Sequence, residues 1–247
     1  MSRGFAFPLL LLGSLLRADG LGDLRSALAR LNGREAIRAT VEYRFWSRQG
    51  DDKKPVITEG RATSLVEEGP QGLRMSWSRP VIQAAVEEAR AQAKDPEKPA
   101  STRRAIEGLK AVDVCDYLDG ADELLRTLEG AQQLEEKSEP WQGKPAKLLL
   151  IKLAPRLSRR DQKYVKELEA TAKIWVGADG LPLGAETRMH MKGRALLVIT
   201  FEQQSRGTFQ FLRSGNRLVV VHHTQESSGS GGGEQGSTRS SVDLRLE

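Results

Sequence analysis

The stretch KIWVGADGLPLGAETRMHMKG, residues 173–193, decides the fold of this chain. Apolar and polar residues alternate on both sides of Asp179-Gly180, and this dipeptide between alternating runs is a strong hairpin signal. After the turn, Met189 and Met191 fall on the apolar side of the pattern. The stretch therefore predicts a long antiparallel hairpin with one apolar face.

The same alternation recurs along the chain, most regularly at residues 37–45, and several further runs continue it. We expect an α+β fold with a single curved antiparallel sheet of about nine strands, an unclosed half-barrel. The apolar side of this sheet gives the candidate cavity residues, which are Val41, Tyr43, Phe45, Leu73, Met75, Trp77, Met189, Met191, Phe209 and Phe211.

Two helical segments are expected to cover the sheet. Leucines at helical spacing predict an amphipathic helix at residues 21–33, and an alanine-rich region predicts a helical insertion at residues 80–132. The Gly/Ser-rich residues 226–241 are predicted to be a flexible loop. Residues 19–247 would then form a single half-barrel domain.

The first 18 residues resemble a secretory signal peptide. Arg3 provides a positive start, residues 5–16 are apolar, and Ala18 suits a cleavage site. The only cysteine, Cys115, is far from that site, so a lipid anchor there and an internal disulfide are both excluded. The sequence thus predicts a periplasmic or secreted protein.

Neither nucleic-acid binding nor a membrane span is expected, the first because of the charge distribution and the second because of the hydropathy. The chain has 38 basic and 33 acidic residues, and the basic ones read as scattered among the acidic ones. Nucleic-acid binding would favour a one-sided basic stripe with stacking aromatic residues. No stretch beyond the first 18 residues approaches 18 consecutive apolar residues, so no stable membrane span is expected in the mature chain.

The order of elements resembles that of the periplasmic lipoprotein-carrier superfamily, the LolA-like and LolB-like half-barrels. The resemblance rests on three stretches, which are LRSALARLNGREAIRATVEYRFW, TEGRATSLVEEGPQGLRMSW and AKIWVGADGLPLGAETRMHMKGRALLVITFEQ. It implies an open sheet wrapped over helices and an apolar cavity for acylated cargo. One departure is clear, because Glu67, Glu68 and Gly69 precede Pro70 where the carriers tend to have a basic residue. The carriers' gating mechanism therefore does not transfer to this chain.

Reactive side chains form no recognisable catalytic motif. His222 and His223 are adjacent on a predicted strand, so they should point to opposite faces, one outside and one packed. Carboxylates at residues 135–139 precede Trp141 and leave an envelope hydrolase as a remote alternative. We expect no enzyme activity, no cofactor and no metal.

Two functions remain open from the sequence. The first is an exported, non-enzymatic binding module that holds a hydrophobic ligand, such as an acyl chain, a lipid or a lipid-modified protein, in an apolar cavity. The second is an interaction domain with a self-filled core, whose sheet edges recruit an envelope protein partner. The first requires that the helices leave part of the apolar face uncovered.

Overall fold

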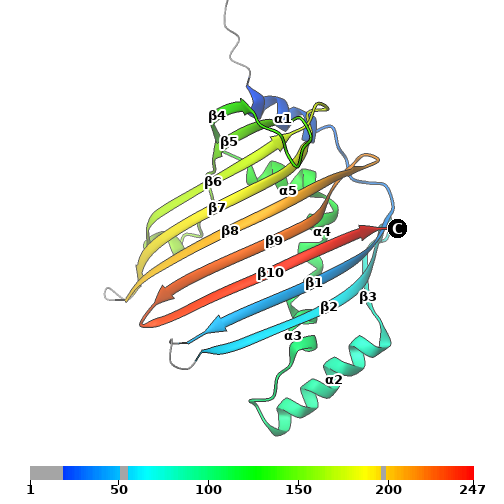
Figure 1. Cartoon of the computed structure of the whole chain (residues 1–247), viewed down its shortest axis with the longest axis vertical. Helices are drawn as coiled ribbons and strands as arrows, with labels where there is room; N and C mark the ends of the chain where they lie inside the picture. Colours follow the sequence, from blue (N-terminus) through cyan, green and yellow to red (C-terminus); the bar gives the residue numbers. More distant parts are fainter. Residues whose placement is uncertain (1–18, 51–54, 196–198) are drawn as a thin grey trace, which may run out of the picture.

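The computed structural model describes residues 19–50, 55–195 and 199–247. These residues form one open antiparallel sheet with five α-helices, all on the same side of the sheet except where α2 extends past its edge (Figure 1). The predicted α+β class with a single unclosed sheet is confirmed, with ten strands in place of about nine. The predicted signal peptide, residues 1–18, lies outside the described residues.

The sheet brings its first and last strands together. Its strand order is β3-β2-β1-β10-β9-β8-β7-β6-β5-β4, so β1 and β10 pair inside the sheet, nearer the β3 edge than the β4 edge. The strands are β1 (Ile37–Gln49), β2 (Val56–Gly69), β3 (Gly72–Trp77), β4 (Gln132–Ser138), β5 (Lys147–Lys152), β6 (Val165–Val176), β7 (Pro182–Ala195), β8 (Ile199–Ser214), β9 (Arg217–Gly231) and β10 (Glu234–Leu246).

The helices lie mostly between β3 and β4, as predicted for the insertion at residues 80–132. They are α1 (Gly20–Leu28), α2 (Arg79–Lys94), α3 (Ser101–Gly108), α4 (Ala111–Leu118) and α5 (Gly120–Thr127), with a short 3-10 helix, η1 (Asp161–Lys163). Because β3 and β4 are the two opposite edges of the sheet, the insertion must cross one face from edge to edge. We call this face the inner face. None of the helices in the described ranges is long and apolar enough to cross a membrane.

The hairpin predicted from residues 173–193 is confirmed as β6 and β7. Asp179 Oδ1 accepts a hydrogen bond from the Leu181 amide at 3.1 Å, and Gly180 has a φ of +80°. Glycine is favoured there because other residues rarely adopt a positive φ. The pairing places Met189 opposite Ala170 on the inner face.

The prediction of a flexible loop at residues 226–241 is wrong. This segment forms the β9–β10 hairpin, which turns at Gly232 and Gly233, both with positive φ. β9 is hydrogen-bonded to β8 on its other side, and β10 to β1. The backbone groups of a Gly/Ser-rich segment are thus satisfied by strands on both sides, whatever its side chains contribute.

Helix α1 is shorter than predicted, ending at Leu28 in place of Gly33. The Arg30 amide donates to Ala27 O and the Leu31 amide to Leu28 O, so the chain continues as tight turns. Leu31 still packs against the core, which explains why the helical spacing of leucines extends past the helix.

A buried ion pair joins strands β9 and β2, and its arginine also reaches the end of α4. Arg217 at the start of β9 is almost fully buried, and its Nη1 donates to Glu68 Oε2 at 2.6 Å. Its Nε donates to Glu35 O at 2.8 Å, and its Nη1 lies 3.5 Å from the carbonyl oxygen of Leu118, where α4 ends. Glu68 is one of the acidic residues before Pro70, so this departure from the lipoprotein carriers has a structural role in the present chain.

Candidate functional site

All ten candidate residues project from the inner face, but they divide between two regions. Strand register places them on one side of the sheet, since paired residues share a face and alternate residues along a strand do too. One region is packed under α3 and α4, and we call it the covered half. The other lies under α5 and beyond it, and we call it the open half.

The covered half is a close-packed core. Val41 is fully buried there against Val114 and Leu118 of α4, and Leu73 and Met75 pack against the same cluster. Tyr43 joins this cluster and stacks on Phe45, with ring centroids 6.3 Å apart. Trp77 is half-buried on β3. These residues were predicted to be cavity candidates, but none of the six lines the cavity described next, because helices of the chain itself occupy the space above them.

The open half contains a cavity of about 660 Å³ between α5 and strands β6 to β9. Pockets that bind small molecules in proteins are typically about 300–1,000 Å³. Three of the ten candidates line it, Met189, Phe209 and Phe211, whereas Met191 lies further along β7 and does not. The apolar walls comprise Leu124, Leu128, Leu153, Ala170, Ala172, Ile174, Ala185, Met189, Phe209 and Phe211.

Small side chains on β6 and β7 leave room for this cavity. Ala170 and Ala172 face inward from β6, and Ala185 faces inward from β7. Alanine ends at Cβ, so three neighbouring alanines leave a depression in the inner face where larger residues would meet α5. Alternation along residues 165–176 puts Ala170 and Ala172 on one face of a strand, yet neither is among the ten cavity candidates.

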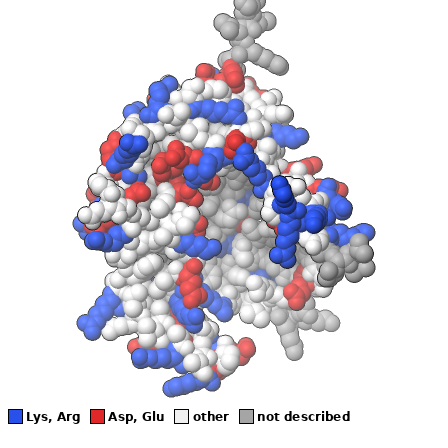
Figure 2. Space-filling view, turned by 180° about the vertical axis from the view of Figure 1, so that it is seen from behind, with Lys and Arg blue, Asp and Glu red and all other residues white. Residues whose placement is uncertain are grey.

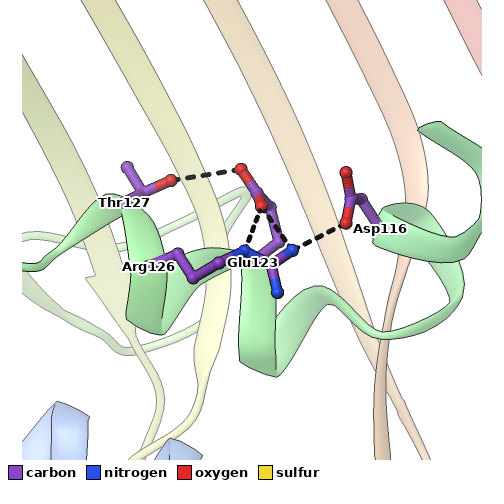
Figure 3. Close-up of polar contacts among 4 residues, drawn as sticks. All are labelled: Asp116, Glu123, Arg126 and Thr127. Carbon is purple, nitrogen blue, oxygen red and sulfur yellow. Dashed lines mark hydrogen bonds and ion pairs between the residues drawn. The ribbon is translucent and has the colours of Figure 1, made fainter. Parts of the chain in front are cut away.

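Charged side chains surround the mouth of the cavity. Seen from the helix side, the surface is hollowed near its middle, with side chains of both signs around the hollow (Figure 2). Arg126 of α5 donates to Glu123 Oε2 and to Asp116 Oδ1, each at 2.7 Å, and Thr127 Oγ1 lies 3.4 Å from Glu123 Oε1 (Figure 3). These contacts hold α5 to the end of α4 at the rim. The hydrogen bond to Glu123 raises the pKa of Arg126 above its usual value.

A second ion pair stands on the rim, between Arg156 and Glu129. Arg156 follows β5, and Glu129 follows α5, so this pair joins the insertion to the β5–β6 connection. Both side chains are well exposed and both line the cavity. The site therefore combines an apolar floor with a polar mouth, which suits an amphiphilic molecule rather than a fully polar one.

The two neighbouring histidines lie as predicted, on opposite faces. His222 Nδ1 is 2.7 Å from Asp243 Oδ1 on the outer face. His223 is packed on the inner face, where its ring stacks on Phe209 at 4.3 Å and its Nδ1 is 3.1 Å from the Tyr117 hydroxyl. Burial lowers the pKa of His223 to about 4, so it is neutral at pH 7. His223 thus packs beside Phe209, a residue of the cavity wall.

Other reactive groups have structural surroundings. Burial raises the pKa of Cys115, which favours the thiol over the nucleophilic thiolate. Glu136, considered for a hydrolase, pairs with Lys147 at 2.8 Å, and Trp141 packs on Trp175 at 4.5 Å. Among the described residues, no group of three or more His, Cys, Asp or Glu side chains is arranged to hold a metal ion.

Sequence reasoning missed the charged rim. Arg126 and Glu123 belong to a helix that was predicted, but their spacing of three residues was not used, although it places both on one side of a helix turn.

Comparison of the chain with protein-family models and with curated proteins finds no match.

Proposed function

We propose that this protein is an exported, non-enzymatic binding module that holds the acyl chain of a lipid or of a lipid-modified protein in the cavity beneath α5. The observation that carries the proposal is the cavity of about 660 Å³ with an apolar lining, in which Met189 and Phe209 are partly exposed beside the buried Ala170 and Ala172. An exposed apolar surface in water is costly, and contiguous ones commonly mark a binding site.

The energetics favour an acyl chain. Burial of a chain of about twelve methylenes contributes on the order of 10 kcal/mol before the cost of ordering it. Met189 suits such a wall because its flexible thioether adapts to ligands of different shape. The charged rim would remain in water with the polar end of the ligand. A distant relationship with the lipoprotein carriers is part of this proposal, supported by the open sheet with helices on one face.

The first test fills the cavity. Ala170→Trp places a large ring into the floor from β6, and Glu169→Trp adds the same ring on the outer face of the same strand as the matched control. Lipid that co-purifies with the protein is measured by native mass spectrometry. We expect lipid on the unmodified protein and on the control, and little on Ala170→Trp. Equal lipid on all three would reject the cavity as the site.

Export is tested separately. N-terminal sequencing of the protein recovered from the periplasm or the medium is expected to begin at Asp19, after the predicted cleavage point at Ala18. Recovery only from the cytoplasm with residues 1–18 still attached would contradict this part of the proposal.

One observation favours the second function, an interaction domain. Helix α2 has no buried residue, and Ile82 and Val86, one turn apart, are each 43% exposed. Helix α2 lies beyond the β3 edge of the sheet, so a partner protein could contact its apolar stripe and the edge strand together (Figure 1). Binding of a partner that is lost in Ile82→Ser/Val86→Ser and kept in Ala170→Trp would favour this function over lipid binding.

A further inference from the structure

The connection between β5 and β6, together with the first two residues of β6, contains most of the net charge of the molecule. Residues 155–166, PRLSRRDQKYVK, contain five basic residues and one acidic residue, a net charge of +4. The whole chain of 247 residues has a net charge of +5. The basic residues of the chain are therefore not evenly scattered, as the sequence analysis held, because this short segment concentrates them.

Local hydrogen bonds present these basic side chains to solvent. The one acidic residue, Asp161, is engaged within the segment, since Ser158 Oγ donates to its Oδ2 at 2.6 Å. The Asp161 amide donates back to Ser158 Oγ at 3.1 Å, and η1 follows. Gln162 Nε2 donates to Leu157 O at 3.0 Å and tightens the turn. The segment is thus a shaped loop, held by bonds that do not use its cations.

Four of the five cations have no ion-pair partner among the residues that the structure describes. Arg156 pairs with Glu129, but within the described part of the chain no carboxylate lies at ion-pair distance from the other four. These four exposed residues, which we call the basic loop, are Arg159, Arg160, Lys163 and Lys166. Arg194 adds to them, because its amide donates to Tyr164 O at 2.8 Å and its side chain is exposed.

The basic loop starts at the wall of the cavity. Leu153, Ala154, Pro155 and Arg156 all line the cavity beneath α5, and the loop follows within three residues. A bilayer surface of anionic phospholipid offers negative charge at its headgroups and acyl chains just below them. An unpaired cluster of cations beside an apolar opening matches both features. A nucleic acid would match the charge alone.

We propose that the basic loop docks this protein on an anionic phospholipid bilayer, with the mouth of the cavity facing the headgroups. The orientation of the cavity mouth toward the headgroups rests on the proposed lipid binding. Docking itself does not require that the cavity be filled. Each Lys or Arg near an anionic surface contributes roughly 1 kcal/mol, so loss of three should weaken binding on the order of 100-fold.

The test measures sedimentation of the purified protein with vesicles of phosphatidylglycerol and phosphatidylcholine, and with vesicles of phosphatidylcholine alone. The test variant is Arg159→Gln/Arg160→Gln/Lys163→Gln. The matched control, Arg79→Gln/Arg90→Gln/Lys94→Gln, removes three exposed cations from α2, which follows β3 at the opposite edge of the sheet. Circular dichroism verifies that both variants fold.

We expect the unmodified protein and the α2 variant to bind the anionic vesicles, and the loop variant to bind about 100-fold more weakly. Binding should fall sharply at 1 M salt, where the screening length is about 3 Å. Equal binding by both variants, equal binding to neutral vesicles, or a preference for single-stranded oligonucleotide over anionic vesicles would overturn the proposal. Ala170→Trp should still bind vesicles, which separates failure of docking from failure of the cavity.

Discussion

Met75 and Met189 illustrate the two halves of the inner face. Both occupy alternating positions on strands and both point toward the helices. Met75 packs in a cluster closed by Val114 and Leu118, whereas Met189 lines an open cavity. The strand pattern is the same in both places. The difference lies in which helices of the insertion cover each residue. Alternation along a strand determines which face a side chain joins, and the helices determine whether that face becomes core or cavity.

The largest expected loss of unfolding free energy comes from breaking the ion pair between Arg217 of β9 and Glu68 of β2. Glu68→Leu leaves the guanidinium of Arg217, whose side chain is only 4% exposed, without its counter-charge. Loss of one partner of a buried pair costs about 3–5 kcal/mol. Urea unfolding should show this loss, and Glu67→Leu serves as the control because Glu67 forms an exposed ion pair, with Arg38. A cost below about 1 kcal/mol, typical of surface pairs, would contradict the role of this pair.

The next-largest change in unfolding free energy is expected when one residue of each half is truncated to alanine. Leu118→Ala removes a fully buried side chain from the covered half and should cost about 3 kcal/mol in unfolding free energy. Met189→Ala removes a side chain that already borders open space, so it leaves little new cavity and should cost under about 1 kcal/mol. Equal costs in urea unfolding would mean that the two halves are packed alike.

A pH effect is expected at the boundary between the halves, where His223 lies between Tyr117 of α4 and Phe209 of the cavity wall. In the folded chain, burial lowers the pKa of His223 to about 4 from its ordinary value of 6.5. As the pH falls below about 6.5, His223 takes up a proton in the unfolded chain before it does so in the folded chain. Its contribution to the unfolding free energy is therefore complete above pH 6.5 and is lost as the pH falls toward 4. The loss should reach roughly 2–3 kcal/mol.

His223→Phe keeps a ring in this place and removes the titration. Unfolding free energies at pH 7 and pH 4.5 should therefore differ less in this variant than in the unmodified protein. The other titrating groups contribute equally to both chains and cancel in the difference. An identical pH dependence in the two proteins would show that His223 is not held neutral by burial.

The smallest effect is expected at the rim. Arg126 is 58% exposed, so its ion pairs with Glu123 and Asp116 are solvated. Arg126→Gln should cost less than about 1 kcal/mol in thermal or urea unfolding. A cost above about 2 kcal/mol would mean that the rim, like the covered half, is part of the structural core.

Much of the sheet follows from the sequence. The strict alternation at residues 37–45 and the Asp179-Gly180 turn predict β1 and the β6–β7 hairpin, because both signals are local. The part of the β9–β10 hairpin at residues 226–241 was wrongly predicted as a loop, since this Gly/Ser-rich segment has no side-chain pattern and is ordered by its neighbouring strands. Pairing between distant strands does not show in local composition.

The candidate site is harder to predict than the sheet. Met189, Phe209 and Phe211 were identified because they alternate, yet Val41 alternates equally well and is fully buried core. The difference depends on which helices lie over each strand, and alternation along the strand does not show this. The basic loop, in contrast, had a readable signal in SRRDQK at residues 158–163, which overall charge counts concealed.

The proposed lipid binding requires that the open half accept an acyl chain and that the covered half exclude one. The most direct measurement is a crystal structure of the protein with a terminally brominated dodecanoic acid, in which anomalous scattering locates the bromine. We predict one bromine site in the cavity beneath α5, within van der Waals contact of Ala170, Met189 or Phe209. Bromine located elsewhere, or no bound bromine at saturating concentration of the acid, would contradict the account.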